Sequence, residues 1–247
     1  MSENDPVSRR NLLRSVGVAA AATATSPVLS DSASAQAPAS APPAASPQAA
    51  AMPASAGYMY FRPAEAAFFE AIVEHMIPAD GLTPGGVELG VATFIDRALA
   101  SGYGKGDRLF MQGPWKLGTP NQGYQLPMTP ADLFRNGVEQ TNIHCTKTYG
   151  GKAFDALAST QKEEVLKGLE AGTIKFANGM PSKAFFDEMY QNVMQGMFGD
   201  PIYGGNRDKA SWRMIGFPGV IATNQKNVAT YKNKKFSVEP LSIADIS

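Results

Sequence analysis

Apolar side chains recur every three to four residues over much of the chain after residue 60, which is the spacing of one face of an α-helix. A first helix is expected to open at Phe61-Arg62-Pro63, because proline is tolerated in the first turn, where its missing N–H has no partner. Pro78 should end this helix, since proline cannot continue the hydrogen-bond ladder. Its apolar face would consist of Phe68, Phe69, Ile72, Val73, Met76 and Ile77.

The same spacing predicts a second helix from about Val87 to Ala100, after a loop over residues 80–86 that is rich in glycine and proline. Its apolar face would consist of Val91, Phe94, Ile95, Ala98 and Leu99. The periodicity then disappears from Ser101 to Met128, where Gly, Pro, Gln and aromatic residues dominate. A structureless loop of this length in a compact domain usually has a role, often contact with a partner.

Capping residues mark two further helices. Thr129-Pro130 predicts a helix that runs to about Tyr149, because a threonine oxygen accepts N–H groups of the first turn and proline suits the first helical position. Thr160 and Glu163 have the spacing of a capping box for a fourth helix, and Gly172 is expected to close it.

A fifth helix begins near Ser182 and carries a broad apolar stripe, which is typical of a central helix packed against several others. The stripe consists of Phe185, Phe186, Met189, Tyr190, Val193, Met194, Met197 and Phe198. Clear β alternation is nearly absent, and residues 226–247 are interpreted as an extended arm with a solvated lysine cluster. The predicted fold is mainly α: a compact single-domain helical bundle with long irregular loops.

The first 35 residues have the three parts of an export signal, in the order that such a signal requires. Arg9 and Arg10 precede an apolar run over residues 16–25, and the small residues around Ala35 suit a signal peptidase. Adjacent arginines in this setting resemble a twin-arginine translocation signal. The run is too short to span a bilayer. We expect cleavage after Ala35; the alternative is an accidental arginine pair on a disordered tail.

Composition separates a leader from the folded domain. Residues 36–56 are almost wholly Ala, Pro, Ser and Gln, a composition that buries too little apolar area to offset the ordering entropy. They are interpreted as a disordered leader, and residues 57–247 as one domain of ordinary size. The twin-arginine route carries folded proteins, often with a cofactor or partner bound. This chain is therefore able to be exported as part of a folded complex.

The charges balance, with 22 Lys and Arg against 22 Asp and Glu. This balance provides no field that would attract the whole chain to nucleic acid or to an anionic membrane, so these partners are not expected. Charged residues make up 18% of the chain, below the quarter or so that is usual. The low share suggests surface that another protein covers. The 11 Met and 13 Phe would suit such a surface, although they equally suit a core.

Residues with catalytic or metal-binding potential are few. His75, His144 and Cys145 are the soft metal ligands, and the last two are helix neighbours that point about 100° apart. The glycines of 102–106 lack the spacing and preceding strand of a dinucleotide site. No Gly-x-Ser-x-Gly elbow occurs. We therefore assign no catalytic, cofactor-binding or metal-binding residue to this chain.

Cys145 is the lone cysteine, and two interpretations of it remain open. Helical spacing places it among apolar residues, which predicts a small buried hydrophobe. In an exported protein, a single cysteine can instead pair with a thiol of another chain.

Two runs late in the chain carry a family resemblance: Met197-Phe198-Gly199-Asp200-Pro201-Ile202-Tyr203-Gly204-Gly205-Asn206-Arg207-Asp208 and Trp212-Arg213-Met214-Ile215-Gly216-Phe217-Pro218-Gly219. Together with Ile77-Pro78-Ala79-Asp80, Pro84-Gly85-Gly86 and Phe94-Ile95-Asp96, they resemble the gluconate 2-dehydrogenase subunit 3 family.

The resemblance implies the small, non-catalytic subunit of a periplasmic dehydrogenase complex that associates with the inner membrane through its partners. In such complexes a flavoprotein subunit binds FAD and oxidises a sugar or sugar acid. A multihaem cytochrome c subunit passes the electrons to quinone. The small subunit supports maturation and export of the flavoprotein. FAD and haem c are therefore expected in the partners, and Cys145 is a candidate for a disulfide to the flavoprotein.

The candidate partner interface combines the turn Tyr203, Gly204, Gly205 and Asn206 with Trp115 and Tyr124 of the long loop. Trp and Tyr are enriched as interface anchors. In the alternative interpretation, the turn only folds the chain so that Trp212 and Phe217 fill the core.

Two other functions remain open, a stand-alone periplasmic enzyme and a periplasmic ligand-binding protein. The sequence of this chain does not determine the substrate of the complex. The candidates are gluconate, 2-ketogluconate, sorbitol, fructose and glucose.

Overall fold

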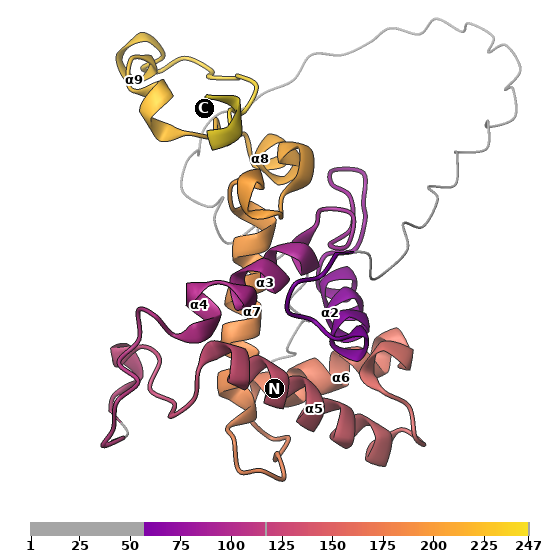
Figure 1. Cartoon of the computed structure of the whole chain (residues 1–247). Helices are drawn as coiled ribbons and strands as arrows, with labels where there is room; N and C mark the ends of the chain where they lie inside the picture. The colour runs from indigo at the N-terminus through magenta and orange to yellow at the C-terminus, as the bar shows by residue number, and fades with distance from the viewer. Residues whose placement is uncertain (1–56, 117, 247) are drawn as a thin grey trace, which may run out of the picture. The chain divides into compact units, whose positions relative to one another are not determined.

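The computed structural model describes residues 57–116 and 118–246, so the predicted signal and leader lie outside the described residues. Over these ranges the fold is built from α-helices and short 3-10 turns, and the described residues contain no β-strand (Figure 1). The longer helices are α2 (Pro63–Met76), α3 (Val91–Ala100), α5 (Pro130–Thr148), α6 (Ser159–Glu170) and α7 (Ser182–Phe198). The mainly α fold that the sequence predicted is confirmed.

Short elements connect these helices. The short α-helices are α4 (Gly102–Lys105), α8 (Ala210–Ile215) and α9 (Asn227–Thr230). The 3-10 turns are η1 (Pro120–Gln122), η2 (Phe154–Ala156), η3 (Pro201–Tyr203), η4 (Arg207–Lys209), η5 (Ile221–Asn224) and η6 (Ile243–Asp245). The long predicted loop thus contains α4 and η1 but is otherwise irregular.

The helix boundaries follow local chemistry, with two corrections. Helix α3 begins at Val91 rather than near Val87, because Gly90 adopts a left-handed conformation with φ of 78°. Helix α6 begins at Ser159, and its start is satisfied by Gln161, whose Oε1 accepts the backbone N–H of Ala158 at 3.1 Å. The predicted box of Thr160 and Glu163 was therefore misplaced by about two residues. Helix α5 opens as predicted, with the Thr129 hydroxyl accepting the backbone N–H of Asp132.

An aromatic cluster lies where α2, α5, η2 and α7 meet. Phe68 of α2 packs against Phe154 of η2 at 5.0 Å between ring centroids, and Phe134 of α5 packs edge-on against Phe185 of α7 at 6.0 Å. All four rings are fully buried. Burial of each such side chain contributes roughly 1.5–3 kcal/mol before ordering costs. These contacts fix the relative positions of the four elements.

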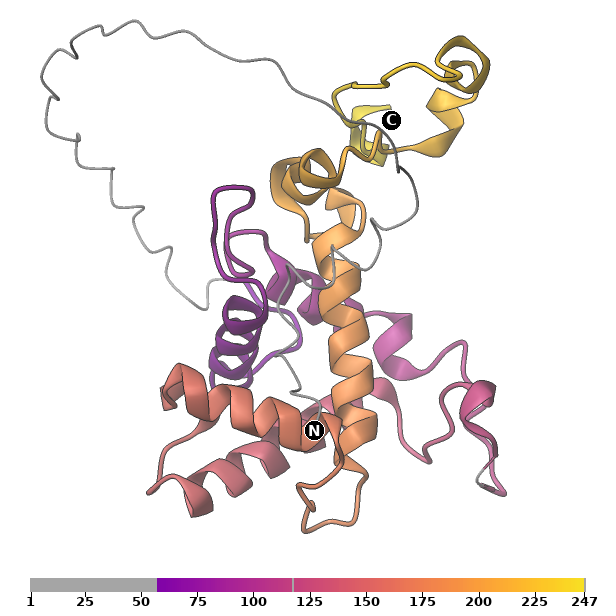
Figure 2. The same cartoon turned by 180° about the vertical axis from the view of Figure 1, so that it is seen from behind.

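Helix α7 is the central helix that its broad stripe predicted. It contacts α3, α5, α6 and α8, and Figures 1 and 2 show it running past the ends of several other helices. Close approach depends on small residues. A Cβ on Gly137 of α5 would lie 2.2 Å from the Phe185 ring, and a Cβ on Gly196 of α7 would lie 3.0 Å from the side chains of Val91 and Phe94.

The C-terminal tail is not the extended arm that the sequence suggested. Val220 donates its N–H to the carbonyl of Leu241 at 2.8 Å, and Leu241 donates to the carbonyl of Pro218 at 3.2 Å, so the chain folds back on itself. The turn at α9 reverses the chain, and the rings of Tyr231 and Phe236 stack edge-on at 4.8 Å. The lysine cluster is exposed, as expected.

Candidate functional site

The turn that follows α7 is held by one buried asparagine. Asn206 is 0% exposed and adopts φ of 45°, a left-handed conformation that asparagine tolerates better than most residues. Its Nδ2 donates to the carbonyl of Gly199 at 3.0 Å, and its Oδ1 accepts the backbone N–H of Ser211 at 3.0 Å. The side chain thus joins the end of α7 to the start of α8.

Glycines allow this turn to lie directly against its neighbours. A Cβ on Gly205 would stand 2.1 Å from the carbonyl oxygen of Gly196, and a Cβ on Gly90 would stand 2.4 Å from the carbonyl oxygen of Gly204. Arg207 donates its backbone N–H to the carbonyl of Leu89 at 3.0 Å. The turn is therefore bonded to the start of α3 as well as to α7.

Trp212 of α8 completes this arrangement. Its ring is buried, packs edge-on against Phe217 at 5.2 Å, and donates its indole N–H to the carbonyl of Phe198 at 2.7 Å. The structural interpretation of the turn is thus correct for Trp212, while Phe217 is only half-buried.

The predicted interface residues of the turn divide into two groups. Gly205 and Asn206 are buried and hold the turn together, so they present little surface that a partner could contact. Tyr203 is 56% exposed and the preceding Ile202 is 46% exposed, so these two side chains are accessible. Gly204 lies between the groups, with φ of 105° that favours glycine.

The long loop brings its two predicted residues to different environments. Trp115 is 40% exposed, whereas Tyr124 is half-buried and donates its hydroxyl to the carbonyl of Met128 at 2.7 Å. The loop is anchored beside α7 through Tyr103, whose hydroxyl donates to Glu188 Oε2 at 3.1 Å. Glu188 and Gly199 are about 16 Å apart along α7 at 1.5 Å per residue, so the loop and the turn do not form one patch.

The Tyr103 cluster was not predicted from the sequence. Asn192 Nδ2 donates to the Tyr103 hydroxyl at 2.9 Å and to the carbonyl of Glu188 at 2.9 Å. Burial raises the pKa of the Glu188 carboxyl and the pKa of the Tyr103 hydroxyl above their ordinary values. Tyr103 lies 85 or more positions before Glu188 and Asn192, and only helix packing brings it to them.

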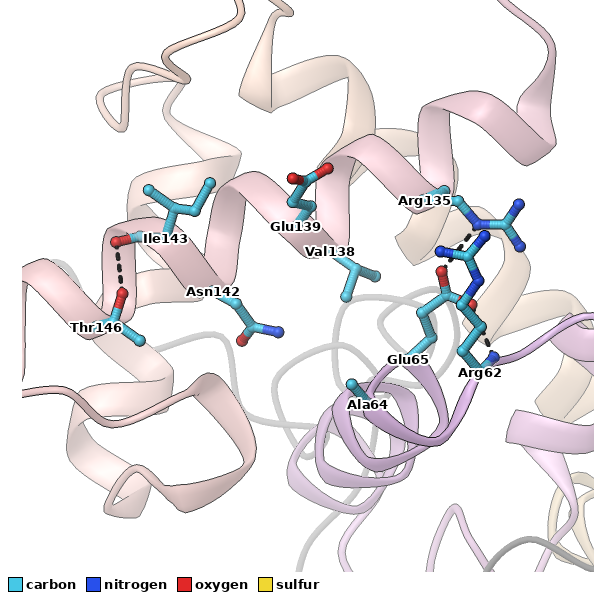
Figure 3. Close-up of a pocket in the computed structure, with 9 residues that line it drawn as sticks. All are labelled: Arg62, Ala64, Glu65, Arg135, Val138, Glu139, Asn142, Ile143 and Thr146. Atoms are coloured by element: carbon cyan, nitrogen blue, oxygen red, sulfur yellow. Dashed lines mark hydrogen bonds and ion pairs between the residues drawn. The ribbon is translucent and has the colours of Figure 1, made fainter.

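A groove of about 460 Å³ lies between the start of α2 and the middle of α5 (Figure 3). Its lining residues are Arg62, Ala64, Glu65, Arg135, Val138, Glu139, Asn142, Ile143 and Thr146. Arg135 Nε donates to Glu65 Oε1 at 2.9 Å, and its guanidinium lies 4.4 Å from the centre of the Tyr60 ring. Glu65 Oε2 also accepts the backbone N–H of Arg62 at 2.9 Å. Two of the charged groups in the groove therefore satisfy each other.

His75 joins α2 to α6. Its Nε2 lies 3.0 Å from Glu163 Oε2, and its Nδ1 lies 3.5 Å from the Ser159 hydroxyl. The hydrogen bond from His75, followed by the one from Lys167, holds the pKa of the Glu163 carboxyl below its ordinary value. The Ser159 contact is too long for a strong hydrogen bond, and we interpret the group as a link between two helices.

Cys145 is a free thiol on the buried face of α5 and is 0% exposed. Burial raises the pKa of this thiol to about 11, so little of the reactive thiolate forms near neutral pH. The interpretation as a buried hydrophobe is thus correct. A disulfide from Cys145 to another chain would require the core around it to open. The neighbouring His144 is half-buried, and burial lowers its pKa.

Metal-binding clusters and membrane-spanning helices are both absent from residues 57–116 and 118–246. Within these ranges, no three or more His, Cys, Asp or Glu side chains gather where they could hold a metal ion. No helix of the same part of the chain combines the length and apolar character needed to cross a bilayer.

Comparison with known proteins gives one match. Residues 63–219 match the family model described as gluconate 2-dehydrogenase subunit 3. Neither a curated protein nor a solved structure matches the chain. The matched range begins with α2 and ends at Gly219, where the chain meets its own C-terminal tail. Because the match covers well over half of the chain, the protein belongs to the gluconate 2-dehydrogenase subunit 3 family.

Proposed function

We propose that this chain is the non-catalytic small subunit of a periplasmic gluconate 2-dehydrogenase-type complex, in which it supports maturation and twin-arginine export of the FAD-containing subunit. The observation that carries the proposal is the family match over residues 63–219, because the family is defined as one subunit of a dehydrogenase. Membership of a multi-subunit complex follows from the family, while the identity of the partners and the route of export are the proposal.

The sequence supports export through Arg9 and Arg10, which lie before an apolar run and the predicted cleavage position at Ala35. A flavoprotein that folds around FAD in the cytoplasm would cross the inner membrane together with this chain, since the twin-arginine route transports folded cargo. FAD and haem c would then belong to the partner subunits, and the complex would associate with the inner membrane through them.

Cell fractionation tests this proposal. The changes Arg9→Lys and Arg10→Lys together should leave the FAD-containing subunit in the cytoplasm, because the paired guanidinium groups are the recognised part of the signal. The dehydrogenase activity of the periplasmic fraction should fall at least about tenfold, because the catalytic subunit would no longer reach it. Both fractions are assayed for FAD fluorescence and for the chain itself by immunoblotting.

Arg14→Lys is the matched control, since it makes the same chemical change a few residues further along. It should leave the flavoprotein in the periplasm. A flavoprotein that reaches the periplasm equally well with both arginines replaced would contradict the export role.

The groove between α2 and α5 is the observation that favours a second candidate, a ligand-binding protein. Its open volume of about 460 Å³ falls within the usual range of small-molecule sites. Against this, Glu65 and Arg135 pair with each other rather than point at a common ligand position. A rise in the melting temperature of the isolated chain with a sugar or sugar acid, absent in Asn142→Leu, would favour this candidate.

A further inference from the structure

The turn after α7 carries large apolar side chains that are exposed rather than buried in the core. Ile202 and Tyr203 are roughly half exposed, although they follow directly on a helix end that is fixed by the bonds of Asn206. A backbone that is already fixed before binding loses little conformational entropy when a partner binds. The turn is therefore preorganised for contact with another molecule.

Asp200 joins this turn to the C-terminal tail. Its Oδ1 accepts the backbone N–H of Ile202 at 3.0 Å, and its Oδ2 accepts the backbone N–H of Ile243 at 2.9 Å. Because one carboxylate holds both N–H groups, the two isoleucine residues lie side by side. Ile243 is itself more than one third exposed, so the apolar surface continues from the turn onto η6.

An ion pair fixes η6 in place. Lys209 Nζ lies 3.0 Å from Asp245 Oδ2, which also accepts the N–H and hydroxyl of Ser242. The bond from the Ser242 backbone, together with Lys209, lowers the pKa of the Asp245 carboxyl to about 2. The carboxylate therefore stays charged at any physiological pH, and the apolar surface keeps its form.

Two guanidinium groups lie beside the same turn. If Gly204 carried a Cβ, Arg97 Nη1 would lie 3.1 Å from it. If Gly90 carried a Cβ, Arg207 Nε would lie 2.7 Å from it. Since Gly90 and Gly204 are in contact, both arginines border the turn. Among the described residues, the acceptors that the Arg207 guanidinium reaches are neutral: the carbonyl of Glu88 at 3.5 Å and the hydroxyl of Thr93 at 3.4 Å.

Neither arginine has a carboxylate partner in the part of the chain that the structure describes. A partner that covered these two groups without supplying acceptors would leave desolvated positive charges, which is costly. The arginine fork also suits bidentate contact with carboxylates. The surface therefore selects a partner that carries acidic groups beside an apolar patch.

A protein fits this requirement better than a lipid surface. Anionic membranes are recognised by clusters of roughly four to eight basic residues, whereas this surface has two arginines and the whole chain is neutral. Tyrosine and arginine are, in contrast, enriched among the residues that dominate protein–protein binding.

We propose that Ile202, Tyr203 and Ile243, together with the guanidinium groups of Arg97 and Arg207, form the surface that docks onto an acidic, partly apolar face of the FAD-containing subunit. We name it the turn surface. The assignment rests on the function proposed above for the partner. It excludes Trp115, Tyr124 and Cys145 from the centre of the interface and adds Arg97 and Arg207, which sequence reasoning missed.

Charge reversal in the complete complex tests this assignment. The FAD-containing subunit carries the affinity tag, and the full chain is produced with it in the native host as wild type or as Arg97→Glu with Arg207→Glu. Because the new carboxylates would face those of the partner, we expect at least about tenfold weaker binding, measured as the dissociation constant of the purified subunits. The melting temperature of the isolated variant shows that it still folds.

The control reverses two charges elsewhere. Lys232→Glu with Lys235→Glu makes the same change in net charge on exposed residues of the tail, and it should alter the dissociation constant less than about threefold, as expected for screened surface charges. A photo-crosslinking amino acid at position 203 should link to a peptide of the flavoprotein rich in Asp or Glu. The same group at Phe110, which is exposed on the long loop, should not.

The outcomes separate the two proposals. If the wild-type chain does not bind the flavoprotein, the proposed function fails. If the wild type binds and the arginine variant binds equally well, the turn surface is not the docking site. Loss of binding to phosphatidylglycerol vesicles by the arginine variant, with the flavoprotein still bound, would also overturn the assignment in favour of a lipid surface.

Discussion

The turn after α7 and the long loop before α5 are both rich in glycine and aromatic residues, but they are held in opposite ways. The turn is bonded to α3, α7, α8 and η6 through Asn206, Arg207 and Asp200. The loop satisfies much of its own backbone locally: Gln122 and Gln125 bond to residues 118, 119 and 123. In Figures 1 and 2 the loop runs out beyond α4 and returns to α5.

This difference shows that similar composition does not mean a similar role. In the turn, glycine is required because backbone atoms of other elements occupy the space of a side chain. In the irregular part of the loop, a Cβ on Gly118 would meet the loop's own glutamine side chains, and Gly123 is favoured by its φ of 74° rather than by close packing. The exposed side chains of the turn therefore lie on a backbone that is bonded to distant elements. Trp115 instead belongs to a loop in which Gln122 and Gln125 form local bonds. Rigid support lowers the entropic cost of binding.

The largest expected effect comes from a side chain placed in the contact between the turn and α7. Gly205→Ala would put a Cβ 2.1 Å from the carbonyl oxygen of Gly196, so backbone must move. We expect the free energy of unfolding to fall by about 1–3 kcal/mol or more, the usual range for overpacking. Urea denaturation of the full chain measures this change.

Gly81→Ala is the matched control, since a Cβ at that position meets nothing within 4 Å. It should change the free energy of unfolding by less than about 0.5 kcal/mol. Equal stability of the two variants would mean that the turn is not rigidly packed on α7.

An intermediate effect distinguishes the hydrogen bonds of the two regions. Asn206→Ala would leave the carbonyl of Gly199 and the N–H of Ser211 without their partner in a buried site, at a cost of about 1–3 kcal/mol. Tyr124→Phe removes one half-buried bond of the loop, to the carbonyl of Met128, and should cost about 0.5–1.5 kcal/mol. Thermal unfolding followed by circular dichroism compares them. The reverse order of melting temperatures would contradict the view of the loop as the less constrained region.

The smallest effect concerns the loop anchor and depends on pH. Burial raises the pKa of Glu188 in the folded state, so the charged carboxylate costs stability at neutral pH, and the cost disappears below the pKa of the unfolded chain, about 4.3. Glu188→Gln keeps an acceptor for Tyr103 without the charge. It should raise the free energy of unfolding by a few tenths of a kcal/mol at pH 7 and by nothing near pH 3.5.

Urea midpoints at the two pH values measure this difference, with the exposed Glu170→Gln as background. If Glu188→Gln is less stable than wild type at pH 7, the charged Glu188 carboxylate stabilises the folded state. The loop would then be anchored by that charge rather than by burial.

The sequence determined the elements of the fold and the family. Helices α2, α5 and α7 follow from apolar spacing together with Pro63, Thr129 and the stripe that begins near Ser182, because these signals are local and need no knowledge of the rest of the chain. The family followed from the runs around Asn206 and Trp212. Local signals were less reliable at boundaries: Gly90 delays α3, and Gln161 rather than Glu163 completes the start of α6.

Only the tertiary structure decided which residues of those runs face solvent. Asn206 and Gly205 carry the most distinctive part of the turn, yet they are buried, because one bonds α7 to α8 and the other lies against a carbonyl of Gly196. Arg97 joins Arg207 at the turn although 110 positions separate them, and Asp200 brings Ile243 beside Ile202. Such pairings depend on how the helices pack, which no spacing within a single segment encodes.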